Sequence, residues 1–123
     1  MTKLKIFHNT ACSKSRATLE LIQKSGQEAE VVDYLKNPPT VVELSELLDL
    51  LKMSPEQIVR RGEEEFSILG LETNPPKTRG EWIKLLVQYP ILIERPIVSD
   101  GKRAVLGRPP ENVLQLLDSG GAC

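Results

Sequence analysis

The sequence predicts an α/β fold, and three observations lead to that prediction. An alternating run, Leu4–Phe7, leads through a polar turn into a run with helical spacing that stops at Gly26. A second strand-like run covers residues 29–34 and carries consecutive valines, so we expect it to be a buried strand. Near the other end, Asp100-Gly101 lies between apolar runs, which indicates a β-hairpin, and a last helical stripe around Leu116 follows it.

The composition limits the classes of protein that need to be considered. The chain has 123 residues, enough for one domain with a real core, which we place at 1–118. Lys and Arg number 16 and Asp and Glu 17, and this balance argues against bulk electrostatic binding to nucleic acid or to a membrane surface. No apolar run approaches the roughly 20 residues of a membrane span. Two cysteines 111 positions apart form no disulfide framework, so the expected setting is the reducing cytoplasm, and we expect a monomer there.

The segment at about 37–89 is predicted to be a helical insertion. Two capping boxes and a Ser-Pro pair mark three helix starts, and an acidic run begins a fourth, shorter helix. The helix that starts at Ser54 is expected to reach Gly62, and the short helix at the acidic run to turn Phe66 and Ile68 inward. The starts lie at Thr40–Glu43, Ser54-Pro55, Glu63–Glu65 and Thr78–Glu81.

Beyond the insertion the chain is expected to return to strands. Ile91–Ile93 predicts a strand that resumes at Ile97–Ser99, and a two-residue turn then leads to the returning strand Lys102–Leu106. A final amphipathic helix follows, and residues 119–123 are expected to be a flexible tail. The order β-α-β, then helices, then β-β-α predicts a thioredoxin-like fold with a helical insertion between its two halves.

Cys12 lies in the turn between the first predicted strand and the first predicted helix. Backbone N–H groups are unpaired at a helix start, and the helix dipole favours negative charge there, so a thiolate is stabilised. Lys14 and Arg16 add positive charge, and the same N–H groups can hold a tetrahedral oxyanion. The alternative is a buried core cysteine, against which the polar neighbours argue. The sequence therefore predicts a reactive thiol beside an anion site.

The residues around Cys12 narrow its chemistry. Ser15 stands where a Cys-x-x-Cys motif has its second thiol, so it cannot resolve a mixed disulfide, although its hydroxyl can donate to the thiolate. Thr18, six positions after Cys12, excludes the arginine-bearing loop of tyrosine phosphatases. The only histidine, His8, could stabilise the thiolate as a cation or help to order the loop, and the alternative is a partly buried histidine satisfied by backbone. One histidine and two distant cysteines lack metal-ligand spacing, so no metal site is predicted.

Three arginines are candidates for binding an oxyanion. Arg95 and Arg108 each precede a proline, which holds their backbone extended, and guanidinium forks suit tetrahedral oxyanions. Pro96 stands where a thioredoxin-like domain commonly has a cis proline beside its thiol. Arg60 would extend the cluster from the insertion. The alternative for each arginine alone is a solvated surface charge, so the shared role depends on the fold placing them around Cys12.

A set of motifs spans nearly the whole chain, from about Lys5 to Leu117. They are His8-Asn9-x-x-Cys12-x-x-Ser15-Arg16, Tyr34-Leu35-x-Asn37-Pro38-Pro39, Arg60, Pro90-Ile91-Leu92-Ile93-x-Arg95-Pro96-Ile97-Val98 and Gly107-Arg108-Pro109. In order and spacing they resemble the glutaredoxin-coupled arsenate reductase (ArsC) family of the thioredoxin-like superfamily.

The resemblance implies a mechanism without a bound cofactor. The Cys12 thiolate would attack arsenate, glutathione as co-substrate would form a mixed adduct at arsenic, and glutaredoxin would reduce it and leave arsenite for release. The implied site residues are Cys12, His8 and Ser15 as catalytic groups and Arg60, Arg95, Arg108 and Asn9 as substrate-binding groups.

Two other functions stay open at the level of sequence. A Spx-type transcription regulator, which binds RNA polymerase and senses oxidation, is related in fold but usually carries Cys-x-x-Cys, which Ser15 removes here. A glutathione-dependent thiol oxidoreductase with another substrate would keep Cys12 but would not need all three arginines.

Overall fold

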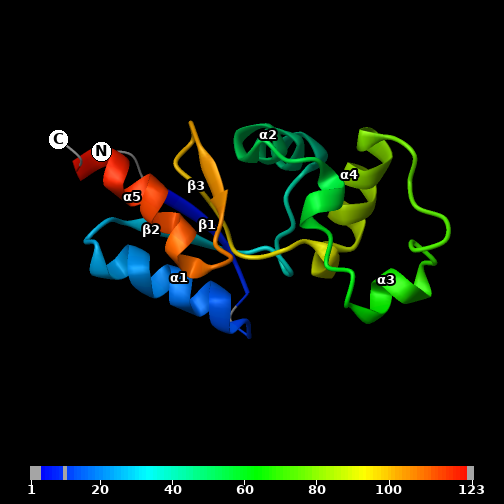
Figure 1. Ribbon diagram of the computed structural model, residues 1–123, viewed down its shortest axis with the longest axis horizontal. Coiled ribbons are helices and arrows are strands. Elements are labelled where there is room, and N and C mark those ends of the chain that lie inside the picture. Colours follow the sequence, from blue (N-terminus) through cyan, green and yellow to red (C-terminus); the bar gives the residue numbers. More distant parts are fainter. Residues whose placement is uncertain (1–3, 10, 122–123) are drawn as a thin grey trace. The chain divides into compact units, whose positions relative to one another are not determined.

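The computed structural model describes residues 4–9 and 11–121, and it divides the chain into two compact units (Figure 1). The first, here called the sheet unit, comprises Met1–Asn37 and Arg95–Cys123. The second, the helical unit, is Pro38–Glu94 and corresponds to the predicted insertion, extended from residue 89 to residue 94. The expectation of a single domain at 1–118 stays a prediction, and each unit is described by itself.

The sheet unit has the predicted order of elements. Its four-stranded sheet has the order β2-β1-β3-β4, in which β1 pairs parallel with β2 while β3 pairs antiparallel with both β1 and β4. The parallel β-α-β unit and the closing β-β-α unit confirm the thioredoxin-like fold. The elements are β1 (Leu4–His8), α1 (Ser13–Lys24), β2 (Ala29–Asp33), β3 (Ile97–Ser99), β4 (Ala104–Leu106), the short 3₁₀ helix η3 (Pro110–Val113) and α5 (Leu114–Gly121).

The core of the sheet unit lies between one face of the sheet and the two helices α1 and α5. Alternate residues of β1, Leu4 and Ile6, point to this face and are almost completely buried together with Val98 of β3. Ile22 of α1 and Leu116 of α5 close the same cluster from the helical side. Burial of this kind contributes about 25 cal/mol for each Å² of apolar surface, so the core fixes α1 and α5 against this face of the sheet.

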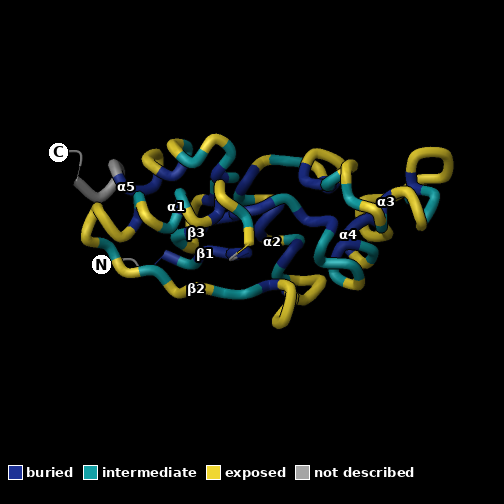
Figure 2. The backbone as a smooth tube through the Cα atoms, turned by 90° about the horizontal axis from the view of Figure 1, so that it is seen from below, coloured by how far each residue is buried: buried dark blue, intermediate teal, exposed yellow. Residues whose placement is uncertain are grey.

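Three details of the sheet unit differ from prediction. Strand β2 is an edge strand, so Val31 is 48% exposed and the expectation of a buried strand is wrong (Figure 2). The hairpin turn has four residues instead of two, because the Asp100 carboxylate accepts hydrogen bonds from the backbone N–H groups of Lys102 and Arg103 and stabilises a wider turn. Helix α5 covers the first three residues of the expected tail 119–123, whose last two lie outside the described residues.

The helical unit is built on the predicted capping boxes. Thr40 accepts from the backbone N–H of Glu43 at 3.1 Å, and Thr78 accepts from Glu81 at 3.1 Å. The leucines of α2 recur three and four positions apart and are buried on one face of the helix. The elements are α2 (Val41–Leu51), the 3₁₀ helix η1 (Pro55–Ile58), α3 (Glu64–Ile68), α4 (Arg79–Gln88) and the 3₁₀ helix η2 (Pro90–Leu92).

Three predictions for the helical unit are wrong. The second helix ends at Ile58, because Val59 becomes extended and forms an isolated antiparallel bridge with Ile93. The predicted strand at 91–93 is mostly the helix η2, in which Pro90 occupies the first position that suits proline. In α3 only Phe66 turns inward, since Ile68 is 71% exposed near the end of a helix of five residues.

Gly107, directly after β4, packs tightly against Thr18 of α1 and against Pro96. A Cβ atom at this position would lie 2.6 Å from Oγ1 of Thr18 and 2.8 Å from Cγ of Pro96. The Gly107 backbone N–H also donates to the carbonyl of Pro96 at 2.9 Å. Only glycine therefore fits this approach without displacing its neighbours.

The first prediction concerns this close approach. Gly107→Ala should lower the free energy of unfolding by about 1–3 kcal/mol, the usual cost of overpacking a tight contact. Denaturant unfolding measures the change, and Gly80→Ala is the matched control because no atom lies within 4 Å of a Cβ at Gly80. In helix α4 that control should be neutral or stabilise by up to about 1 kcal/mol. Equal stability of Gly107→Ala and wild type would contradict the close contact.

Candidate active site

Cys12 is the N-cap residue of α1, as the sequence predicted. Its backbone is extended, with φ −98° and ψ 122°, and its carbonyl accepts the N–H of Arg16 at 3.0 Å as the helix begins. The Cys12 N–H donates in turn to the carbonyl of Asn9 at 3.0 Å, which closes the loop between β1 and α1. The thiol is partly exposed, so it is open to a reagent or substrate.

The surroundings of Cys12 favour the thiolate. Burial alone would raise the pKa of the thiol, but the backbone N–H of Ser15, the Arg95 guanidinium and the backbone N–H of Lys14 together hold the pKa below its ordinary value. Lys14 and Ser15 are the second and third residues of α1, the positions whose N–H groups an N-cap side chain normally serves. The Cys12 side chain does not form a standard N-cap hydrogen bond, and the first turn of α1 has no acidic residue. These N–H groups therefore remain available to stabilise a negative charge.

Arg95 and Arg108 both lie at the thiol. Nη1 of Arg108 is 3.9 Å from Sγ of Cys12 and donates to the carbonyl of Arg95 at 3.0 Å. The Arg95 side chain is buried, with 8% of the residue exposed, and its Nε and Nη1 atoms have no hydrogen-bond partner among the described residues. The bonds from these arginines to Pro96 and Pro109 are both cis, and the cis form predicted for Pro96 is confirmed.

His8, Asn9 and Ser15 order the loop that carries the thiol. Nδ1 of His8 lies 2.6 Å from Oγ of Ser15, which also accepts the backbone N–H of Asn9 at 3.1 Å. Oδ1 of Asn9 accepts the N–H of Ala11 at 2.9 Å, within the same turn. The expectation that the Ser15 hydroxyl donates to the thiolate is therefore corrected: its hydroxyl faces His8, and its backbone N–H acts on Cys12.

His8 is suited to a neutral role in this network. It is 4% exposed, and burial lowers the pKa of its imidazole, while Asp33 opposes that shift and Arg16 reinforces it. A neutral imidazole can accept a hydrogen bond from the Ser15 hydroxyl at Nδ1. The Ser15 oxygen can then accept a second hydrogen bond from the Asn9 backbone N–H. Of the two roles open from sequence, the geometry favours ordering of the loop.

Arg60 belongs to the helical unit, where two carboxylates hold its guanidinium. Nε donates to Glu63 at 3.1 Å and Nη1 donates to Glu94 at 2.8 Å, and all three side chains are only 22–25% exposed. The predicted role of Arg60 at the thiol stays a prediction, as does the assignment of Asn9 to substrate.

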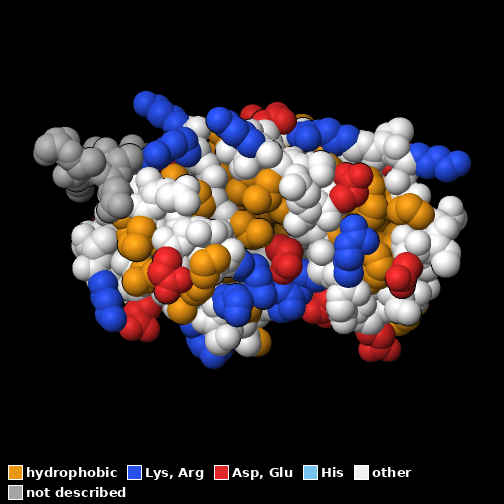
Figure 3. Space-filling model, in the orientation of Figure 1, with side chains coloured by type: hydrophobic (Ala, Val, Ile, Leu, Met, Phe, Trp, Pro, Cys, Tyr) orange, Lys and Arg blue, Asp and Glu red, His pale blue; other side chains and the backbone are white. Residues whose placement is uncertain are grey.

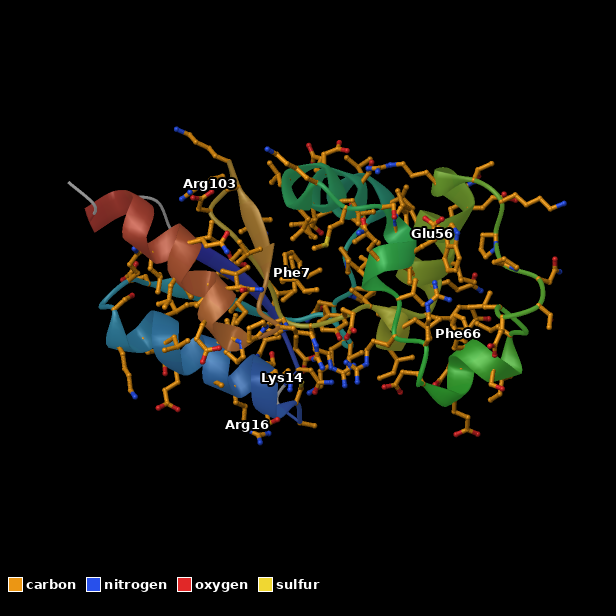
Figure 4. The ribbon with its side chains drawn as sticks, in the orientation of Figure 1. Phe7, Lys14, Arg16, Glu56, Phe66 and Arg103 are labelled. Carbon is orange, nitrogen blue, oxygen red and sulfur yellow. The ribbon has the colours of Figure 1, made fainter. Side chains whose placement is uncertain are left out.

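Positively charged side chains lie at the surface close to the thiol. Lys14 and Arg16 extend from the start of α1 beside the thiol loop (Figure 4). Elsewhere positive and negative side chains are interspersed over the face shown in Figure 3, in agreement with the net charge of −1. No helix in the described part of the chain is long and apolar enough to cross a membrane.

Two residues of this region had no role assigned from the sequence. Tyr34 is 1% exposed and acts on the Arg95 guanidinium, and Gly107 holds the turn that bears Arg108 against α1. Their signal was their presence in the motifs Tyr-Leu-x-Asn-Pro-Pro and Gly-Arg-Pro. The motifs indicate that these positions matter but do not show which residues they contact.

These features define a class of protein: a thioredoxin-like domain with an activated thiol at a helix start and two arginines beside it. A family model described as ArsC family matches residues 7–116. An arsenate reductase of Neisseria meningitidis is 40% identical over 118 residues, which is 95% of this chain and 100% of that protein. The chain belongs to the ArsC family.

Other relatives agree in extent. The uncharacterized protein YfgD of Escherichia coli is 42% identical over 119 residues, 95% of this chain and 99% of that protein. The solved structure of an arsenate reductase from Vibrio cholerae superposes with a TM-score of 0.86 at 36% identity, covering 93% of this chain and 97% of that one. The similarity to these proteins therefore extends over both the sheet unit and the helical unit.

The second prediction tests the influence of Arg95 on the thiol. Arg95→Gln removes the guanidinium that stabilises the thiolate, so the Cys12 pKa should rise and the thiol should react only at higher pH. The rate of alkylation by iodoacetamide, measured against pH, gives the midpoint. Arg103→Gln is the control, since Arg103 pairs with Asp100 on the hairpin. An unchanged midpoint in Arg95→Gln would refute the proposed influence.

The third prediction separates loop ordering from thiolate stabilisation. Ser15→Ala leaves the buried N–H of Asn9 without its acceptor, so the free energy of unfolding should fall by about 1–3 kcal/mol. The midpoint of Cys12 alkylation should stay close to wild type, because the backbone N–H of Ser15 is retained. Ser13→Ala, at an exposed position of the same turn, is the control. A rise of the midpoint as large as that of Arg95→Gln would show that the hydroxyl does reach the sulfur.

Proposed function

We propose that this protein reduces arsenate to arsenite through Cys12, with glutathione and glutaredoxin as the reductants. The observation that carries the proposal is the buried Arg95 guanidinium beside an activated thiol, because two of its nitrogens lack a hydrogen-bond partner among the residues that the structure describes. Buried donors on a charged group cost free energy when they stay unpaired, so this site favours an anion with several acceptor oxygens. The family supports arsenate as that anion, since the relative from N. meningitidis bears the name arsenate reductase.

The proposed reaction begins with attack of the Cys12 thiolate on arsenic(V). An S–As bond forms, and one arsenate oxygen leaves as water after protonation. A glutathione thiol then displaces a second oxygen as water and gives a mixed adduct at arsenic. A glutaredoxin thiolate attacks the glutathione sulfur and forms a mixed disulfide, and the electron pair of the broken bond between glutathione sulfur and arsenic reduces arsenic to the trivalent state. Hydrolysis of the remaining S–As bond releases arsenite and restores Cys12.

The residues of the chain serve this reaction by positioning and by charge. Two anions, the thiolate and arsenate, must approach each other, and Arg95 and Arg108 offset their repulsion. The N–H groups at the start of α1 stabilise the thiolate before attack, and a group that stabilises the thiolate also makes Cys12 a better leaving group at the end. Arg60 is proposed as a third ligand of the oxyanion.

Further parts of the proposal concern the setting of the protein. Ser15 occupies the position at which a second cysteine could have resolved an adduct, so the second thiol comes from outside the turn. Glutathione kept at a reducing potential is a feature of the cytoplasm, and we place the protein there as a monomer.

The fourth prediction tests the proposed function directly. Wild-type protein with glutathione, glutaredoxin and glutathione reductase should consume NADPH only when arsenate is added. Cys12→Ser should abolish turnover, because serine is not ionised at neutral pH. Cys123→Ser is the matched control and should retain turnover, since glutathione supplies the second thiol. Absence of arsenate-dependent turnover in wild type, with Cys12 still alkylated rapidly at neutral pH, would assign the thiol to another substrate.

A further inference from the structure

We infer that Tyr34 is a positioning residue of the oxyanion site, whose hydroxyl group holds the Arg95 guanidinium against Cys12. The inference rests on the proposed function only in its effect on arsenate. Its effect on the thiol stands on the geometry of the sheet unit.

The fold brings Tyr34 to the thiol loop. Strands β1 and β2 are parallel, and His8 at the end of β1 is in register with Asp33 at the end of β2. Tyr34 follows Asp33 directly, so it leaves the sheet at the edge where the loop to Cys12 begins. Although β2 is an edge strand, Tyr34 is 1% exposed. A tyrosine this deeply buried normally places its hydroxyl on a hydrogen-bond partner.

Arg95 is the group on which this hydroxyl acts. Burial opposes the charge of Arg95, yet its pKa is raised, because at the high pH where arginine titrates the ionised Tyr34 and Cys12 attract the guanidinium, and both side chains also hydrogen-bond to it. At neutral pH a phenol carries no charge, so Tyr34 then acts on Arg95 through the hydrogen bond. The Nε and Nη1 atoms remain without a partner among the described residues. The guanidinium is thus held by Tyr34 and the thiol, with N–H groups left over for a ligand.

A neutral partner suits this function better than a carboxylate. In the helical unit Arg60 donates to both Glu63 and Glu94, which together cancel its positive charge locally. A phenol oxygen accepts a hydrogen bond without cancelling the charge, so Arg95 keeps its attraction for a thiolate and an oxyanion. Tyr34 fixes the orientation of a long side chain before substrate arrives, which reduces the entropy lost on binding.

Tyr34→Phe tests the inference because it removes only the hydroxyl and keeps the buried ring. The Cys12 pKa should rise in the alkylation profile, and the KM for arsenate should increase about tenfold, the usual cost of losing one hydrogen bond to a charged group. The loss should fall mainly on KM, since Tyr34 does not contact the reacting atoms. Tyr89→Phe is the matched control, as Tyr89 is the other tyrosine and ends α4 in the helical unit.

A double variant decides whether Tyr34 acts through Arg95. Tyr34→Phe combined with Arg95→Gln should react like Arg95→Gln alone, because the hydroxyl then has no guanidinium to hold. Additive effects on the alkylation midpoint would overturn the inference, as would a Tyr34→Phe variant that loses stability but keeps the wild-type midpoint. A shifted midpoint in Tyr34→Phe, when wild type does not reduce arsenate at all, would support the positioning role and refute the proposed substrate.

Discussion

The start of helix α1 at Cys12 is the constraint on which the site depends. A helix leaves its first N–H groups unpaired, and a serine, threonine or aspartate oxygen usually accepts them. Here the capping position carries sulfur, so the N–H groups of Lys14 and Ser15 stabilise a thiolate instead. This arrangement requires a rigid loop before the helix, which the buried pair of His8 and Ser15 provides. The polar side chains of His8 and Ser15 therefore stabilise the loop itself, while the backbone N–H groups at the start of α1 stabilise the thiolate.

Arg60 and Arg95 differ in burial and in their hydrogen-bond partners, and these differences affect how each guanidinium can bind an anion. Arg60 donates from Nε and Nη1 to two carboxylates, so an oxyanion bound to Arg60 has to share the guanidinium with Glu63 and Glu94. Arg95 has a neutral phenol and a thiol as neighbours, and two of its buried nitrogens have no hydrogen-bond partner in the described part of the chain. Leaving a buried charge incompletely paired is costly, so a site of this kind is stabilised further when an oxyanion binds. Binding of an oxyanion relieves the unfavourable free energy of the incompletely paired guanidinium, and this relief contributes to the affinity.

Local patterns predicted much of the fold and the position of the thiol. Capping boxes and apolar stripes depend on residues three or four positions apart, and both boxes and the cap at Cys12 were found as predicted. The failures arose where tertiary context decides. The valines of β2 suggested burial, but strand order places them at an edge, and residues 91–93 have strand-like composition but follow a proline that starts a 3₁₀ helix.

The partners within the site were beyond the reach of local patterns, because the contacts join distant positions. Arg108 meets Cys12 across 96 positions, and Thr18 reaches Gly107 across 89. The arginines could be proposed from their chemistry, since guanidinium and oxyanion suit each other wherever the fold brings them together. Tyr34 could not, because a buried tyrosine is compatible with any core, and only the register of β1 and β2 places it beside the thiol loop. Sequence chemistry thus identifies the groups proposed to bind the substrate, whereas the groups proposed to orient them follow from the register of the sheet.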